Sequence, residues 1–219
     1  MSEIPQTRSI RQRDAWLSIT ACFLLQIFVG SVLLHPALNI LSSVSKLTLG
    51  YVSVIFILLF PVIYLSFRYG TINISDFLPR RSDFTVLFVA LIILVIIYTP
   101  IFLLHGHYES YAFYGQKLSQ LPEFEYFIVL LATCLIIPFI EETLFRRYIF
   151  ELFRNKYKIP TALFLTAFTG TLLHIGYSSI TALIGVFFSM IFFTLIYFKS
   201  RLGVSIAIHC LTNMLKYFF

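Results

Sequence analysis

Charged residues are scarce in this sequence. Of its 219 residues, 12% are Asp, Glu, Lys or Arg, 59% are hydrophobic, and the mean hydropathy is +0.90. An ordinary soluble domain has about 25% charged residues. The shortage of charge excludes a separate soluble domain of useful size and favours an integral membrane protein in the cell membrane.

Cysteines are few, and nucleotide-binding glycine loops are lacking. The only cysteines, Cys22, Cys134 and Cys210, all lie inside apolar runs, which indicates small buried residues and excludes a disulfide framework. No Walker-type glycine loop is found, which argues against an ATP-driven machine. No internal duplication is found either, which argues against a proton-coupled transporter built from two halves.

What the sequence does contain is a series of apolar runs, each near the roughly 20 residues needed to cross about 30 Å of hydrocarbon. They predict an all-α polytopic membrane bundle of about seven transmembrane helices. Residues 1–14 are expected to form a cytoplasmic segment and residues 15–219 a single membrane domain, whose first run is a retained anchor. The runs lie at about 15–34, 47–67, 84–104, 124–145, 160–178, 180–198 and 204–219.

Basic residues indicate the orientation. The formal net charge of +6 comes from sixteen Lys and Arg residues. In a membrane chain such residues mark cytoplasmic loops and contacts with lipid headgroups, so we expect the bilayer, and no nucleic acid, as the partner. With the N-terminus in the cytoplasm, all but three basic residues fall on the inner side; the three on the outer side are Lys46, Lys117 and Lys216.

Very few ionisable residues interrupt the apolar runs. Such residues are costly inside a membrane and indicate a functional site when they converge. The fourth run contains Glu141 and Glu142, followed by Arg146 and Arg147, while the fifth contains His174 and the seventh His209.

The two adjacent acids are predicted to have different roles. Glu142 and Arg146 are four residues apart, so on a helix they face each other as a supporting ion pair. Glu141 points roughly 100° away from Glu142 and is left for chemistry. Pro138, three residues earlier, is expected to kink this helix beside Glu141.

The histidines are expected to meet Glu141. Counted from the turn near residue 158, Glu141 and His174 lie about equally far along two antiparallel helices, and so at similar depth. This placement leaves the fifth helix short beyond His174. His209 and Asn213, four residues apart on the last helix, share one face at a comparable depth.

Such a set of side chains suits hydrolysis. A carboxylate and a neutral histidine that share one water can deprotonate it for attack on a carbonyl group. His209 and Asn213 are then placed to donate hydrogen bonds to the resulting oxyanion. The residues predict a peptidase that uses water as its nucleophile and takes a peptide or membrane protein as its substrate.

Three short motifs resemble those of a known family. EETLFR at 141–146, His174 and HCLTN at 209–213 resemble the EExxxR, FxxxH and HxxxN or HxxxD motifs of the CAAX protease and bacteriocin-processing family of intramembrane endopeptidases. The resemblance covers about residues 124–217. It departs from the family at Gly170, where phenylalanine is usual, which puts the shape of the pocket in question.

The resemblance implies a function and some alternatives. It implies that Glu141 and His174 hold the catalytic water and that His209 and Asn213 stabilise the oxyanion, in peptide maturation or bacteriocin self-immunity. We favour a mechanism without a cofactor; the alternative is a divalent metal such as zinc, held by Glu141, His174 and His209. The alternative function is a non-enzymatic immunity or scaffold protein of the same fold.

Overall fold

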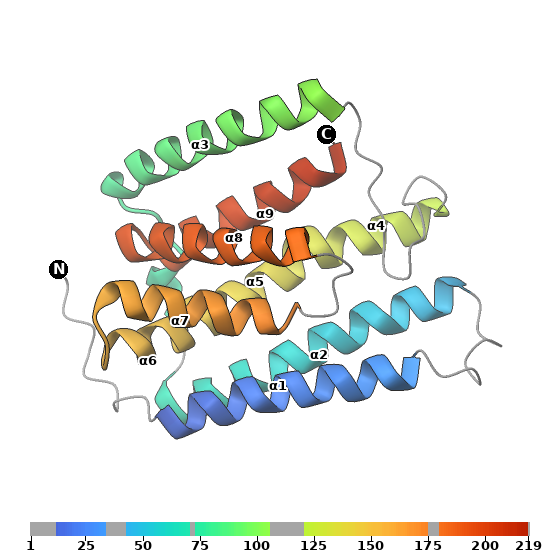
Figure 1. Cartoon of the computed structure of the whole chain (residues 1–219), viewed down its shortest axis with the longest axis horizontal. Coiled ribbons are helices and arrows are strands. Elements are labelled where there is room, and N and C mark those ends of the chain that lie inside the picture. Colours follow the sequence, from blue (N-terminus) through green and yellow to red (C-terminus); the bar gives the residue numbers. More distant parts are fainter. Residues whose placement is uncertain (1–11, 34–42, 71–72, 106–120, 175–179, 219) are drawn as a thin grey trace.

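A computed structural model describes residues 12–33, 43–70, 73–105, 121–174 and 180–218 of the chain. Within these ranges the regular structure is entirely helical, which confirms the predicted all-α membrane bundle. Seven rods run back and forth across the molecule (Figure 1). They are α1 (Gln12–Leu33), α2 (Ser43–Tyr69), α3 (Arg81–His105), a continuous rod from Glu123 to Arg154, α7 (Ile159–Leu172), α8 (Ile180–Lys199) and α9 (Leu202–Phe218).

Length and composition agree with a membrane location. Among the described residues, three helices are long and apolar enough to cross a membrane: Leu49–Tyr69, Glu123–Arg154 and Ile180–Lys199. Shorter apolar helices cover Trp16–Val29, Ile159–Leu172 and Leu202–Leu215. Many large apolar side chains on the outer faces of these helices are exposed, Phe56, Phe67 and Phe88 among them, as expected for surfaces in contact with lipid.

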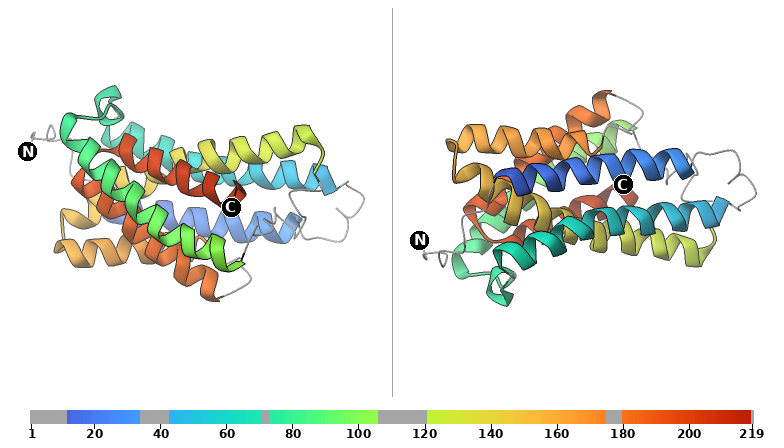
Figure 2. Two further views of the ribbon diagram at one scale, coloured as in Figure 1. Left: turned by 90° about the horizontal axis from the view of Figure 1, so that it is seen from above. Right: turned by 90° about the horizontal axis from the view of Figure 1, so that it is seen from below.

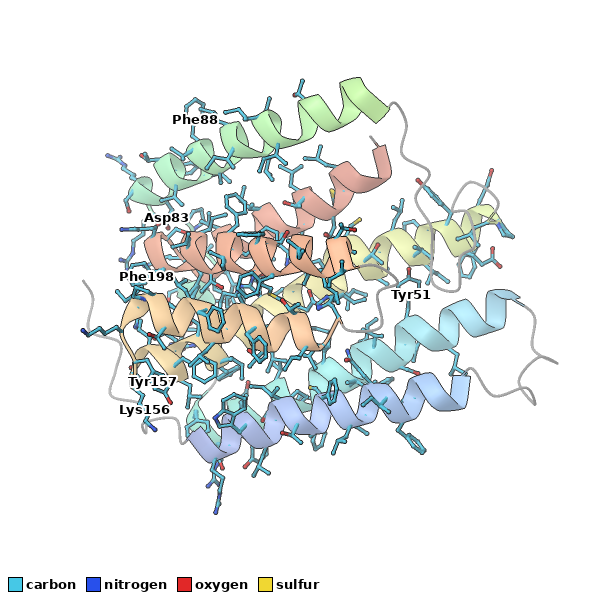
Figure 3. The ribbon with its side chains drawn as sticks, viewed as in Figure 1. Tyr51, Asp83, Phe88, Lys156, Tyr157 and Phe198 are labelled. Carbon is cyan, nitrogen blue, oxygen red and sulfur yellow. The ribbon has the colours of Figure 1, made fainter. Side chains whose placement is uncertain are left out.

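Basic residues gather at one end of the bundle, which we call the basic end. The start of α1, the α2–α3 connection, the α6–α7 turn and the α8–α9 turn all lie there (Figure 1). Asp83, Lys156, Tyr157 and Phe198 mark this end in Figure 3, well away from Tyr51. That most basic residues lie at one end agrees with their assignment to one side of the membrane. The placement of this end in the cytoplasm stays a prediction.

The rod from Glu123 to Arg154 holds the first motif. It consists of α4 (Glu123–Leu131), η5 (Ala132–Ile136), α5 (Ile137–Glu142), η6 (Thr143–Phe150) and α6 (Glu151–Arg154), where η5 and η6 are π-helical. The apolar run predicted an end near residue 145. The rod instead continues to Arg154. Arg146 is fully buried against Glu142, so this arginine lies inside the bundle and not at its edge.

Helix α7 is short, as the position of His174 predicted. Its 14 residues span about 21 Å at ~1.5 Å per residue, which is less than the hydrocarbon thickness. Pro160 lies in the first turn of α7, where the missing N–H has no helical partner to lose. The helix ends just before His174, whose backbone N–H bonds to the carbonyl of Thr171. His174 therefore lies inside the bundle, at the end of a helix.

The core lies where the rod from Glu123 to Arg154 packs against its neighbours. Phe145, Ile149 and Phe150 have no exposed surface and belong to a cluster that also includes Leu65 of α2 and Ala167 of α7. Two further views show the rods surrounding this segment (Figure 2). Close van der Waals packing of this kind stabilises the middle of a membrane bundle, where the polar motif residues also lie.

A short connection packs closely on the start of α9. The turn η2 (Ile74–Asp76) precedes Phe77, whose ring stacks on Phe139 of α5 at 5.5 Å. The side chain of Arg201 donates hydrogen bonds to the carbonyls of Ser75 and Leu78. A Cβ at residue 203 would lie 2.0 Å from the Phe77 carbonyl oxygen, so this approach requires glycine.

We therefore expect Gly203→Ala to destabilise the protein by about 1–3 kcal/mol, because a backbone atom would have to move. Gly185→Ala is the matched control, since nothing lies within 4 Å of its new Cβ on α8, and it should be neutral or slightly stabilising. Thermal unfolding in detergent measures both. Equal unfolding temperatures for the two variants would contradict the close approach.

Candidate active site

Glu141 lies between two histidines: His174, which lies just after α7, and His209 of α9. Its Oε1 is 3.7 Å from Nε2 of His174, and its Oε2 is 3.8 Å from Nε2 of His209. All three side chains are largely buried, with 17% of the His174 side chain and 10% of each of the others exposed. These gaps are long for direct hydrogen bonds and suit a bridging water. The predicted meeting of acid and histidines is present in the structure.

The local backbone orients His174. Its Nδ1 lies 2.8 Å from the carbonyl oxygen of Gly170, one turn earlier on α7. A carbonyl only accepts, so Nδ1 carries the hydrogen, and in the neutral ring Nε2 keeps its lone pair. That lone pair is on the nitrogen nearest Glu141. The ring is thus oriented so that Nε2 faces the carboxyl group of Glu141.

Glu142 is the centre of a second group of contacts. It has no exposed surface, and its Oε1 accepts a hydrogen bond from Nδ1 of His209 at 2.8 Å. Its Oε2 accepts from the hydroxyl of Ser205 and lies 3.1 Å from Nε of Arg146. The predicted pair of Glu142 and Arg146 is confirmed. Glu142 also orients His209, a role that the spacing of the residues did not predict.

Arg146 packs between α5 and α8 with no exposed surface. Its guanidinium carbon lies 5.6 Å from the centre of the Phe193 ring, and Nη2 is 3.4 Å from the carbonyl of Met190. The same Phe193 ring stacks on the imidazole of His209, with centroids 4.4 Å apart. An arginine over an aromatic face in apolar surroundings is stabilised by a cation–π interaction. Phe193 therefore holds both Arg146 and His209 in place.

Asn213 follows His209 by one turn of α9. Its Nδ2 donates a hydrogen bond of 2.9 Å to the backbone carbonyl of Thr133 in η5. The side chain is half-buried. Asn213 therefore reaches the same rod as His209, although its contact is with the backbone one turn before Pro138.

Two contributors, Ser205 and Phe193, were missed from the sequence. Ser205, His209 and Asn213 recur every four residues on α9, so one face of this apolar helix has three polar side chains in a row. That spacing was the available signal for Ser205. Nothing in the sequence separates Phe193 from the other aromatic residues, which make up 18% of the chain.

The space beside Gly170 is filled from another helix. A Cβ at this position would meet Cε of Met190 at 2.5 Å and its Sδ at 2.9 Å. Met190 is 3% exposed and lies on α8, which packs closely along α7. The end of the Met190 side chain thus fills the space that the first atoms of a phenylalanine side chain at position 170 would need.

We expect Gly170→Phe alone to destabilise the protein by about 1–3 kcal/mol through overpacking. Combining it with Met190→Ala should recover most of that loss, because the smaller residue vacates the contested volume. The matched control is Met190→Ala alone, which leaves a cavity and should cost about 2–5 kcal/mol. Thermal unfolding in detergent tests the set. Additive losses in the double variant would show that the two side chains do not compete.

The same three side chains, Glu141, His174 and His209, are the candidate ligands for a metal. Across the described residues, no group of three or more His, Cys, Asp and Glu side chains has the arrangement of a metal site. The donor types of Glu141, His174 and His209 suit zinc, and both histidines have Nδ1 bonded to an acceptor, as ligands usually do. The mechanism without a metal stays a prediction, and a divalent metal such as zinc stays the alternative.

Fold and site together define a class of protein: a polytopic helical membrane protein with a buried carboxylate between two histidines. Residues 123–215 match the family model described as type II CAAX prenyl endopeptidase Rce1-like. The three motifs lie inside this segment, and the match agrees with the family that they indicated. No curated protein and no solved structure matches the chain. The match implies intramembrane protease activity of the CAAX type.

Proposed function

We propose that this protein is an intramembrane endopeptidase that hydrolyses a peptide bond with a water activated by Glu141 and His174. One observation is central to the proposal. Glu141 lies within 4 Å of Nε2 of both His174 and His209, although the three residues come from three separate segments of the chain. This cluster falls inside the segment that matches the Rce1-like family.

In the first step, one water donates its two hydrogens to Oε1 of Glu141 and Nε2 of His174. The separation of 3.7 Å between these atoms leaves room for the water to contact both. Glu141 takes a proton as the water oxygen bonds to the carbonyl carbon of the substrate. His174 orients the water through Nε2, while the bond from Nδ1–H to the Gly170 carbonyl holds the ring in place.

In the second step, the negative charge on the carbonyl oxygen is stabilised and the amine leaves. In its protonated form, His209 donates a hydrogen bond from Nε2 to the oxyanion, while Nδ1 keeps its hydrogen bond to Glu142. The C–N bond then breaks, and the proton held by Glu141 passes to the leaving nitrogen. Asn213 is the predicted second donor to the oxyanion, and this role stays a prediction.

The substrate class follows from the family description. A type II CAAX prenyl endopeptidase acts on a prenylated peptide, so we propose a lipidated peptide that enters from the membrane or the basic end. The exposed apolar side chains around the bundle are compatible with a substrate that arrives through the bilayer. The surrounding lipid is then a partner in substrate delivery.

Two experiments test the proposal. Purified protein in detergent should cleave a farnesylated CAAX peptide at a single bond, as followed by mass spectrometry. Membrane peptides from cells with wild-type protein or Glu141→Ala should differ by one cut, which would identify the natural substrate. No cleavage of either kind, together with a phenotype retained in Glu141→Ala, would instead support the non-enzymatic alternative. Turnover that persists after chelation would support the metal-free mechanism.

A further inference from the structure

The helical hydrogen-bond pattern of η5 is interrupted at Pro138, where a backbone donor is missing. In this π-helical turn, the N–H of Ile137 bonds to the carbonyl of Ala132, five residues earlier. In the same register, the next N–H, that of residue 138, would bond to the carbonyl of Thr133. Residue 138 is proline, which has no N–H to donate. A buried carbonyl without a donor is costly inside an apolar bundle.

A side chain from another helix reaches this carbonyl. Nδ2 of Asn213 lies 2.9 Å from the Thr133 oxygen and donates to it. We propose that Asn213 is a positioning residue: its amide replaces the hydrogen bond that Pro138 cannot make, and so fixes α9 against the turn that aims Glu141. This role requires no contact between Asn213 and the substrate, so it is the alternative to the donation to the oxyanion that the sequence predicted.

The contact is well placed to act on the site. Pro138 precedes Glu141 by three residues, and Asn213 follows His209 by four, so the bond lies about one turn from each. On the same face of α9, Ser205 and His209 both bond to Glu142, and both also contact Phe193 of α8. The bond from Asn213 to Thr133 is a separate anchor, and two anchors on one face prevent α9 from rotating or sliding along the rod.

Losing one anchor therefore changes the distance between Glu141 and His209. A displacement of about 1 Å at a catalytic site can lower the rate about 10²-fold. The kinetic part of this inference rests on the proposed function. The effect on stability does not, because it follows from the hydrogen bond alone.

A double-variant cycle tests the inference with Asn213→Ala, Pro138→Ala and the two combined. Alanine at 138 supplies the missing backbone N–H, so it should make the amide of Asn213 dispensable. We expect Asn213→Ala to lower kcat about 10- to 100-fold with little change in KM. It should also lower the unfolding temperature by about 2–4 °C, as the loss of one hydrogen bond predicts. The combined variant should regain at least tenfold in kcat and most of the unfolding temperature.

Thr212→Ala is the matched control, because among the described residues the Thr212 hydroxyl bonds within α9, to the carbonyl of Ile208. It should lower kcat less than threefold, and Pro138→Ala should not improve it. The assay uses a farnesylated CAAX peptide and purified protein in detergent. Turnover by wild-type protein tests the proposed function separately, and the unfolding series remains decisive without it.

Each outcome decides the inference. If the losses of the two single variants multiply in the combined variant, Asn213 acts as a donor to the substrate and the inference is overturned. A combined variant that unfolds no later than Asn213→Ala overturns it as well, whatever its activity. Failure of Pro138→Ala to fold would also overturn it, since the new N–H would then not reach the Thr133 carbonyl in the native register.

Discussion

Substitution of Glu141 by glutamine is expected to lower kcat for cleavage of a farnesylated CAAX peptide by about 10²–10⁴-fold. Glutamine keeps the size and the hydrogen-bonding reach of the side chain but cannot take a proton from water. The side chain lies between His174 and His209, so neither neighbour moves into its place. KM should change little, because the proposed role of Glu141 is confined to the transition state.

The matched control for this variant is Glu151→Gln. Glu151 is a buried acid on the same rod, 2.6 Å from Nη2 of Arg154 and two turns beyond the site. It should keep wild-type turnover per folded molecule, even if its unfolding temperature falls. Equal turnover in Glu141→Gln and wild-type protein would eliminate Glu141 as the base, and a loss of turnover in Glu151→Gln would show that the effect is not specific.

The second large effect is expected for Arg146→Met. Removal of one partner from a buried ion pair costs about 3–5 kcal/mol, because the other charge is left uncompensated. Glu142 would keep its bonds to Ser205 and His209 but lose the cation 3.1 Å away. For a chain of this length, such a loss lowers the unfolding temperature by about 6 °C or more. Differential scanning fluorimetry in detergent measures it directly.

The double variant Glu142→Leu with Arg146→Met separates charge from packing. It removes both buried charges and should be less destabilised than Arg146→Met alone. It should still have very low turnover, because His209 loses the carboxylate that orients its ring. A double variant less stable than either single variant would mean that side-chain volume, and not uncompensated charge, dominates at this site.

Much of this site follows from counting residues along helices. Apolar runs gave the rods, and the four-residue spacing gave the pair of Glu142 and Arg146. The similar depth of Glu141 and His174 followed from their distances to one turn, because an antiparallel helix pair converts sequence separation into depth. The short fifth helix followed from the same count.

Other contacts depend on how helices rotate about their own axes. Whether His209 bonds to Glu141 or Glu142 depends on the rotation of α9, and its Nδ1 bonds to Glu142. The π-helical turns η5 and η6 also change which residues of the rod share a face. Spacing rules assume 3.6 residues per turn, so they cannot predict such a shift, and the bond from Asn213 to Thr133 is invisible to them.

The contact between Gly170 and Met190 bears on how motifs in this family are used. A motif describes one segment of chain, whereas the volume beside His174 is shared by α7 and α8. When the first helix supplies glycine, the second can supply the bulk, and the total filling is preserved. A survey that scores position 170 alone would discard this chain as atypical. Scoring the pair of positions would group proteins by how the space between these two helices is filled.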